Sequence, residues 1–504
     1  MAGVVVLGAI MSILDITVVS VALKTFQTVF HATPAQVAWT MTGYTLALAS
    51  VIPLTGWAAD RFGTKRLYLL AVVLFAAGSA LCATAPNLEL LVTYRVLQGL
   101  GGGMLMPLGM TILTRAAGPE RVGRVMAVLG IPMLLGPIFG PILGGWLIDT
   151  ASWHWIFLIN VPIGAAALVY AGMVLPSDRV EPSETFDWVG MLMLSPGLAL
   201  FLFGVSSIPE EGTIWSTRVL ASAIVGLVLI VAFVPWALSG RTAHPLVDLR
   251  LFKIRRMTIA VIAMSLFAMA FFGASLLFPL YFQEVRGETA LKAGTLLAPQ
   301  GIGAMITMPI AGILADRIGP GKIVLVGITV ITVGMAMFTQ VDTATSYLFL
   351  LGSLFIMGLG MGATMMPIMT AALASLSHES TARGSTLLNI TQQVAASIGT
   401  ALFSVLLTNG FKASTSITIA GALNAAGGDP QRKQAVIERF NLTPSDLAAL
   451  PARVLDAMAG SFANVFIVAT VLVACCLIPA WFLPRRKLTT PEGESVDPAL
   501  LVGH

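Results

Sequence analysis

Charged residues are scarce in this sequence. Of 504 residues, 10% are Asp, Glu, Lys or Arg and 57% are hydrophobic, with a mean hydropathy of +0.90. A soluble domain carries about 25% charged residues, so this chain has too few polar groups to cover a surface in water. A water-soluble globular protein is therefore excluded, and we expect lipid to be the main solvent of the folded chain.

Residues for metal, redox or nucleotide chemistry are also few. The three cysteines, Cys82, Cys475 and Cys476, lie in apolar stretches, which favours packing over a disulfide or metal site. The five histidines are scattered over loops and termini, and neither a G-x-x-x-x-G-K loop nor an H-E-x-x-H pair is present. The net charge of +4 is spread over loops. We therefore expect no cofactor, no metal, no nucleic-acid partner and no enzymatic activity.

Long apolar runs fill most of the chain. At about 20 residues per membrane-spanning helix, fourteen spans fit the sequence. The first run holds Asp15 and lacks a basic start, so it is interpreted as a retained span rather than a signal peptide. The expected spans lie at 3–24, 36–59, 67–86, 88–114, 122–149, 154–175, 187–208, 216–238, 257–283, 292–315, 321–340, 344–374, 384–409 and 458–483.

The distribution of Lys and Arg predicts the orientation. If the N-terminus is cytoplasmic, the short outer loops hold Lys24, Arg218, Arg286 and Lys292, while the inner loops hold most other loop cations. Positive residues are enriched in cytoplasmic loops. The chain is therefore expected to be a multi-pass protein of the plasma (cytoplasmic) membrane, with both termini in the cytoplasm because the span number is even.

An internal repeat divides the chain. "GWAADRFGTKRLYLL" begins at Gly56 and "GILADRIGPGKIVLV" at Gly312, each between the second and third spans of a six-span block. Two parallel six-helix halves are a transporter architecture, with the site between the halves. The expected division is an N-terminal bundle at 1–176, an inserted pair of transmembrane helices at 177–240, a C-terminal bundle at 241–487 with an extracytoplasmic loop at 410–457, and a cytoplasmic tail at 488–504.

The repeated loops are candidate gates. A carboxylate there can cap a neighbouring helix or pair with an arginine across the bundle, and so hold one conformational state. The same cations also set topology, and the two roles are compatible. The second copy has Pro320 and lacks paired basic residues, which weakens its assignment. The gating candidates are Asp60, Arg61, Gly63, Lys65, Arg66, Asp316 and Arg317.

The stretch "LGIPMLLGPIFGPILGGWL" at 129–147 combines many glycines and prolines. Water would melt such a helix, because interior Pro removes a hydrogen bond and Gly costs about 1 kcal/mol against Ala, but hydrocarbon tolerates both. The glycines leave a smooth face for close helix packing. Such a helix can seal one side of a transporter, and an ordinary packing face is the alternative. The residues concerned are Gly136, Pro137, Gly140, Pro141, Gly144 and Gly145.

Asp15 is the acidic residue placed deepest within a predicted span. Intramembrane carboxylates are costly and usually functional, and low dielectric favours the neutral form, so Asp15 can load and release a proton near neutral pH. The helical rise places Asp15 about 13 Å and Arg95 about 10 Å below the outer ends of their helices, so the two charges lie at similar depth. Permanent pairing would oppose proton loading, so we expect the pairing to change during transport. A purely structural ion pair is the alternative.

A polar stripe and a set of apolar residues are candidates for a substrate cavity. Polar residues of the thirteenth span recur at spacings of three and four, on one helical face, although interhelical hydrogen bonding would explain them too. Methionine and aromatic side chains re-pack around many apolar shapes, but any membrane core contains them. The candidates are Thr386, Asn389, Gln393, Ser397, Met264, Phe271, Phe278, Tyr281, Gln283, Glu284 and Met365.

Several stretches together carry a family resemblance. In order they are "LDITVVSVAL" from Leu14, "GWAADRFGTKR", "YRVLQGLGGG" from Tyr94, the Gly/Pro helix, "WHWIFLINVPIG" from Trp153, and then "FPLYFQ", "GILADRIG" and "GSTLLNITQQVAASIGTAL". The chain resembles the fourteen-span drug:proton antiporter branch of the major facilitator superfamily, the EmrB/QacA type. It departs from that pattern at Lys24, where a proline commonly stands.

The resemblance implies an all-α integral membrane fold of two six-helix major facilitator bundles plus two inserted helices. It also implies a role in proton coupling for Asp15, Arg95 and Gln98. The function expected is proton-driven antiport that exports lipophilic, neutral or monocationic compounds (multidrug efflux) by alternating access. An exporter or flippase of lipid-like molecules is the alternative, and a non-transporting sensor would leave both gate motifs idle. The expected partners are a lipophilic substrate, protons and the bilayer; a periplasmic adaptor protein and the oligomeric state are left open.

Overall fold

A computed structural model describes residues 1–32, 34–117, 130, 136, 139–140, 142–148, 150–176, 186–211, 215–239, 245–373, 376, 380–427 and 429–485. Within these ranges every regular element is a helix, as expected from the sequence. Thirteen helical segments there are long and apolar enough to cross a membrane. The span expected at 122–149 lies largely outside the described residues, although 142–148 form a helix.

The first half of the chain supplies one group of helices. They are α1 (Ala2–Val29), α2 (Pro34–Phe62), α3 (Thr64–Ala83), α4 (Leu88–Ala117), α6 (Trp155–Leu158) and α7 (Asn160–Val174). Two further helices follow, α8 (Trp188–Glu211) and α9 (Thr217–Leu238), and then the short helix η2 (Leu249–Lys253).

The second half begins with a helix broken by two π segments: α10 (Arg255–Phe267), η3 (Ala268–Phe272), α11 (Leu277–Leu280) and η4 (Tyr281–Val285). The next elements are α12 (Ala290–Leu296), α13 (Ala298–Ile318), α14 (Pro320–Met337), η5 (Phe338–Gln340), α15 (Tyr347–Gly362) and α16 (Met365–Leu373). The last are α17 (Thr381–Ala413), α18 (Thr415–Ala425), α19 (Pro430–Arg439), α20 (Pro444–Cys475) and α21 (Leu477–Trp481).

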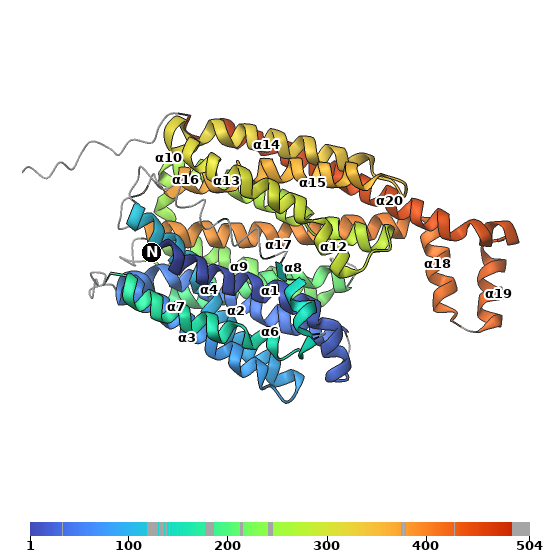
Figure 1. The fold of residues 1–504 in the computed structure, drawn as a ribbon, viewed down its shortest axis with the longest axis horizontal. Coiled ribbons are helices and arrows are strands. Elements are labelled where there is room, and N and C mark those ends of the chain that lie inside the picture. Colours follow the sequence, from blue (N-terminus) through green and yellow to red (C-terminus); the bar gives the residue numbers. More distant parts are fainter. Residues whose placement is uncertain are drawn as a thin grey trace, which may run out of the picture.

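The helices form two groups side by side (Figure 1). Helices α1–α4, α6 and α7 make one group, and α10–α16 with α20 make the other, while α17 runs between them and contacts α2 and α4. Helices α8 and α9 pack on each other, and α8 contacts both α2 and α17. The inserted pair therefore lies against both halves.

The two ends of the bundle differ. The N-terminus lies at one end, together with the turn between α2 and α3, because Met1 and Thr64 line the same pocket. We call this the Asp60 end. At the other end α20 extends past the bundle and carries α18 and α19 with it (Figure 1).

The last long helix begins earlier than the sequence suggested. The expected span was 458–483, whereas α20 starts at Pro444. Thr443 and Asp446 form a reciprocal capping box, and Pro444 occupies the first turn, where its missing N–H costs nothing. Much of the expected loop at 410–457 is therefore helical. A loop is expected there from the sequence because hydropathy identifies apolar spans and does not detect polar helices that extend them.

The internal repeat is visible in the backbone. Gly63 and Gly319 adopt nearly the same conformation, φ 87° and ψ 140° against φ 91° and ψ 140°, directly before α3 and α14. Glycine reaches positive φ without the steric cost that a side chain brings. Pro320 then occupies the first turn of α14, a position that favours proline. The second copy thus keeps the turn despite its altered sequence.

Candidate functional site

A buried ionic network lies within the first group of helices. Asp15 on α1 and Arg95 and Gln98 on α4 are at most 1% exposed. Arg95 Nη1 forms an ion pair with Asp15 Oδ2 and donates to Gln98 Oε1 at 2.7 Å. Gln98 Nε2 donates to Asp15 Oδ1 at 2.8 Å. The three-residue spacing of Arg95 and Gln98 puts both on the face of α4 that meets α1.

Helix α2 completes the surroundings of Arg95. Arg95 Nε donates to the Thr40 carbonyl at 3.0 Å, and the guanidinium lies 4.2 Å from the centroid of the Tyr44 ring. The Tyr44 hydroxyl is hydrogen-bonded to Ser12 at 3.2 Å. A carboxylate, an amide, a carbonyl and an aromatic face thus share the buried positive charge, which offsets part of its desolvation cost.

Helix α7 reaches the same carboxylate. Asn160 Nδ2 donates to Asp15 Oδ1 at 3.2 Å and to Ser79 Oγ at 3.1 Å, and Ser79 donates to the Phe157 carbonyl at 2.9 Å. Asn160 and Phe157 belong to the stretch "WHWIFLINVPIG", which contributes to the family resemblance. Sequence reasoning missed Tyr44, Ser79 and Asn160, and the signal that could have found Asn160 is an amide inside an apolar run.

Three described glycines of the Gly/Pro helix lie against α1, whereas Gly130 lies against Met308 of α13 and Met366 of α16. A Cβ added to Gly136 or Gly140 would overlap Ile13 or Thr17, and one added to Gly144 would lie 3.1 Å from Val18 Cγ1. A Cβ at Gly145 would meet nothing within 4 Å. Three glycines therefore allow close approach to the part of α1 that carries Asp15. Pro137 and Pro141 lie outside the described residues.

Asp60 connects the two halves. Its Oδ1 lies 3.3 Å from Arg115 Nη2 on α4, and its Oδ2 lies 3.4 Å from Arg383 Nε at the start of α17. Arg383 Nη1 also lies 4.0 Å from Asp248 Oδ2. These side chains are mostly buried, so water screens the pairs only in part. The ion pairs hold α2, α4 and α17 together at the Asp60 end.

Neutral contacts join α4 and α17 nearby. The hydroxyls of Thr111 and Ser385 are 2.9 Å apart, Ser385 also donates to the Pro107 carbonyl at 3.2 Å, and Asn389 Nδ2 lies 3.0 Å from Met110 Sδ. At the same level, a Cβ on Gly56 would lie 3.1 Å from Thr386 Oγ1. These contacts occupy the first turns of α17, on the same side as Asp60.

The other gating candidates are placed differently. Lys65 donates to the carbonyls of Gly172 and Leu175 at 2.9 and 2.6 Å, at the end of α7, where a cation is favourable. Arg66 and Arg317 are exposed, and Arg61 and Asp316 are half-buried.

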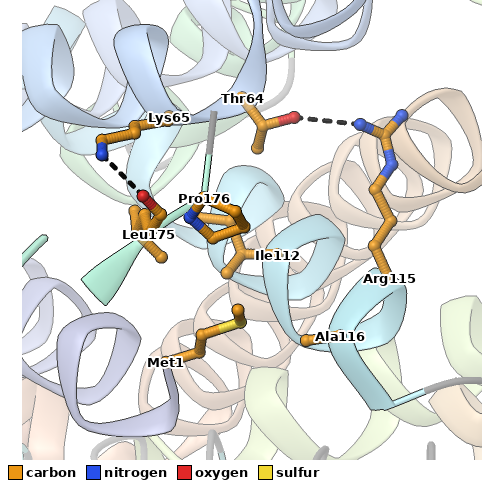
Figure 2. A pocket seen from close by; sticks show the side chains of 8 residues that line it. All are labelled: Met1, Thr64, Lys65, Ile112, Arg115, Ala116, Leu175 and Pro176. Atoms are coloured by element: carbon orange, nitrogen blue, oxygen red, sulfur yellow. Dashed lines mark hydrogen bonds between the residues drawn. The ribbon is translucent and has the colours of Figure 1, made fainter. Parts of the chain in front are cut away.

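A pocket lies at the same end of the first half. It has a volume of about 170 Å³ and is lined by the eight residues drawn in Figure 2, among them Lys65 and Arg115. Its wall consists of the ends of α3, α4 and α7 with Met1. Met1 is about four turns of α1 from Asp15, so this pocket is separate from the ionic network.

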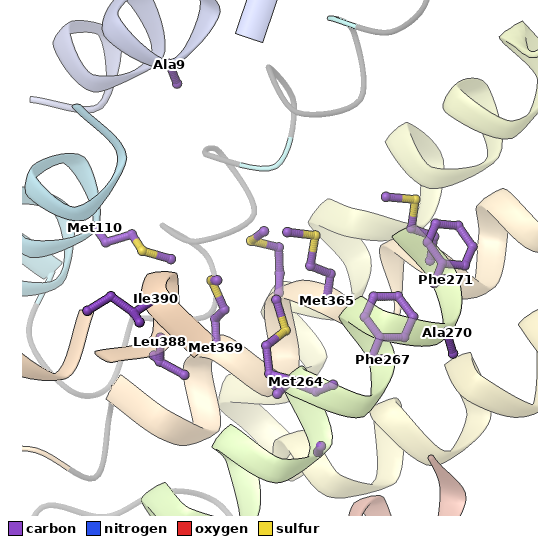
Figure 3. Packing of buried hydrophobic residues seen from close by; sticks show 14 of the residues in the cluster. Ala9, Met110, Met264, Phe267, Ala270, Phe271, Met365, Met369, Leu388 and Ile390 are labelled. Atoms are coloured by element: carbon purple, nitrogen blue, oxygen red, sulfur yellow. The ribbon is translucent and has the colours of Figure 1, made fainter. Parts of the chain in front are cut away.

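Part of the apolar candidate set faces the first half. Met264, Phe271 and Met365 are buried, and they belong to one cluster with Met110 of α4 and Ala9 of α1 (Figure 3). Phe271 stacks on Phe267, with ring centroids 5.2 Å apart. Methionines from α4, α10 and α16 therefore gather where the halves approach each other.

The two other aromatic candidates belong to the same cluster but contact different elements. Phe278 packs on Phe338 and Phe466, with centroids 5.0 and 5.2 Å away, and Tyr281 donates to the Asp342 carbonyl at 2.7 Å, so both contact the second half.

The polar candidates differ in how far they are buried. Gln283 Nε2 donates to the carbonyl of Pro279 in its own helix at 3.2 Å, and Glu284 is exposed. In the polar stripe, Thr386 is buried, while Gln393 and Ser397 are half-buried, like Asn389.

Two repeated groups of membrane-crossing helices, with a buried ion pair in one and the Asp60–Arg383 ion pair bridging the two, define a polytopic membrane transporter. Residues 5–400 match the model of the Major Facilitator Superfamily, and the chain belongs to that family. The fold class expected from the sequence, two bundles with two inserted helices, is thereby confirmed.

Similar proteins show to which branch of the family the chain belongs. The chain is 51% identical over 488 residues to the "Multidrug resistance protein B homolog" of Mycobacterium tuberculosis, covering 96% of this chain and 90% of that protein. It is 34% identical over 415 residues to the "Multidrug export protein EmrB" of Escherichia coli K12, covering 80% and 79%. The resemblance to the EmrB/QacA type is confirmed.

Solved structures agree on the fold. The human organic anion transporter MFSD10 superposes with a TM-score of 0.59 at 17% identity, covering 94% of this chain and 98% of that one. The proton:xylose symporter XylE gives a TM-score of 0.55 at 15% identity, covering 94% and 95%. At these identities the likeness concerns the fold alone.

Proposed function

We propose that this protein is a proton-coupled antiporter that exports lipophilic, neutral or singly charged compounds by alternating access. The observation that carries the proposal is the buried network of Asp15, Arg95 and Gln98. An intramembrane carboxylate on a movable ion pair is suited to carrying a proton. The names of the relatives, a multidrug resistance protein homologue and a multidrug export protein, support the substrate class.

Protonation of Asp15 would change the packing of α1. The neutral acid no longer balances the Arg95 guanidinium, and a buried unpaired charge is strongly destabilising. Arg95 must then find water or another acceptor, which changes the contact between α1 and α4. Because Ile13, Thr17 and Val18 on α1 contact the glycine helix, the same change reaches the packing between that helix and α1.

The Asp60 end is the gate that this cycle must open. On the distribution of Lys and Arg we assign this end to the cytoplasm, with both termini there. In the structure, the ion pair between Asp60 of α2 and Arg383 of α17 holds the two halves together at that end, and Arg115 of α4 binds the same carboxylate. Loading of a substrate from the cytoplasm requires Asp60 and Arg383 to separate.

Removing the Asp60 charge should favour the open gate. A partly buried ion pair contributes about 1 kcal/mol, so Asp60→Asn should raise the open-to-closed ratio about fivefold. The measurement is the rate at which a membrane-impermeant maleimide labels a single cysteine placed at Ser385, which is fully buried at the seam. Lys322→Gln, an exposed charge at the same end, is the control. Equal labelling of Asp60→Asn and its parent would contradict the gate.

The ionic network also limits the charge of the substrate. Among the described residues, Asp15 is buried within α1, and Asp187, the other buried carboxylate, lies just before α8, where it accepts from Trp236 and from backbone N–H groups. Glu284 is exposed. A rigid dication would leave one charge uncompensated at low dielectric, at a cost of several kcal/mol. Monocations and neutral lipophiles should therefore be exported better than rigid dications of similar size, as competition assays with matched pairs would measure. Equal transport of dications would show that a second acidic site exists.

Reconstituted protein tests the proposed function. In liposomes with an imposed pH gradient, a fluorescent lipophilic monocation should be moved against its own gradient, and a protonophore should stop the movement. Transport at the same rate with and without the pH gradient would overturn proton coupling. The control is empty liposomes, which measure passive partition of the dye.

A further inference from the structure

Asn160 has unusual surroundings for an amide inside a membrane protein. It is the first residue of α7 and is 2% exposed. Both hydrogen bonds of its side chain are made by Nδ2, to Asp15 Oδ1 at 3.2 Å and to Ser79 Oγ at 3.1 Å. Within the part of the chain that the structure describes, no hydrogen bond has Asn160 Oδ1 as its acceptor. Half of the bonding capacity of the amide is thus unused in this state.

A carboxylate that gains and loses a proton needs different partners in its two forms. The ionised form only accepts hydrogen bonds, whereas the protonated form must donate one. Arg95 has five N–H donors and no acceptor, so it suits only the ionised form. The Gln98 oxygen already accepts from Arg95 at 2.7 Å, and the Cys82 thiol lies 3.7 Å from it. Neither neighbour on α4 is therefore ready to accept from a protonated Asp15.

Asn160 can serve both forms. Rotation by half a turn about Cβ–Cγ exchanges Nδ2 and Oδ1, because the two ends of an amide have the same shape. The oxygen would then accept from the Asp15 hydroxyl. Ser79 can follow, since a hydroxyl either donates or accepts: it now accepts from Asn160 and donates to the Phe157 carbonyl, and after the rotation it would donate to Asn160 instead.

We propose that Asn160 is a positioning residue that holds Asp15 in place in both its ionised and its protonated form. The inference rests on the proposed proton coupling at Asp15 and deepens it. No proton passes to Asn160: the proton stays on Asp15, and the amide only reverses the direction of its hydrogen bond.

The test is the pH dependence of transport by Asn160→Leu, which removes the amide but keeps the branch at Cγ. Hydrogen bonds to charged groups are stronger than those between neutral groups. The loss therefore disfavours ionised Asp15 more than protonated Asp15. The pH of half-maximal efflux should rise by about half a unit to one unit, and the maximal rate should fall about fivefold. Asn160→Gln, which keeps an amide, should show a smaller shift in pH than Asn160→Leu.

Controls separate this inference from folding and from the proposed function. Thr93→Ala, an exposed hydroxyl on α4 bonded to its own helix, should keep the parent profile, and size-exclusion chromatography should show folded Asn160→Leu. An unchanged profile, or a slower rate with an unchanged midpoint, would overturn the role of Asn160 while leaving proton coupling standing. Proton-driven transport that survives Asp15→Asn would instead overturn the proposed function, and this inference with it.

Discussion

Asp15→Asn should reduce efflux driven by a pH gradient to the level of empty liposomes. The asparagine keeps the size of the side chain, and its single amide oxygen can still accept from Arg95, but it cannot take up or release a proton. The measurement is dye export from proteoliposomes under an inward proton gradient. The variant should remain folded and monodisperse in detergent, because its amide oxygen can accept from Arg95 and its NH2 group can donate to Asn160 once the Asn160 amide has rotated.

Asp456→Asn is the matched control for that experiment. It makes the same chemical change at an exposed carboxylate near the far end of the bundle, where Asp456 accepts from Thr343 at 2.9 Å. Its export should equal that of the parent protein. If Asp15→Asn also exported dye at the parent rate under the gradient, Asp15 would be a structural ion-pair partner and not the proton carrier.

Gly140→Leu should impair transport much more than Gly145→Leu. A side chain at Gly140 would overlap Thr17, whereas one at Gly145 would meet nothing within 4 Å. Overpacking of a close helix contact costs typically about 1–3 kcal/mol, and here it also pushes against the helix that carries Asp15. The two positions are five residues apart, about one and a half helical turns, so they share an expression background. The measurement is initial export rate per molecule of folded protein; equal rates would show that the glycine face is not a moving contact.

The ionic network was the most predictable part of the site. Two opposite charges at the same depth of an apolar bundle have few partners other than each other, and helical rise alone placed Asp15 and Arg95 at one level. The structure then adds Tyr44, Ser79 and Asn160. Neutral polar residues occur singly in many spans, so the sequence alone does not separate these three from packing residues.

The apolar cavity was less predictable because the helix that carries it is irregular. All four apolar side chains of this helix, Met264, Phe271, Phe278 and Tyr281, belong to one buried cluster, but Phe278 packs on α20 and Tyr281 bonds to the loop after η5. The π segments at Ala268–Phe272 and Tyr281–Val285 add residues to a turn, so the facing residues no longer follow a period of 3.6.

Arg383 could not be predicted as a partner of Asp60. In the sequence it is one more loop cation, and only the fold brings it to Asp60.

Substrate-stimulated proton release from the purified protein tests the central claim most directly. In weakly buffered detergent solution, addition of a lipophilic monocation should release protons, because the cation binds when Asp15 is ionised and so displaces the proton of Asp15. The release should disappear in Asp15→Asn and persist in Asp456→Asn. Binding of the substrate without any proton release by the parent protein, or the same release from Asp15→Asn, would contradict antiport through this carboxylate.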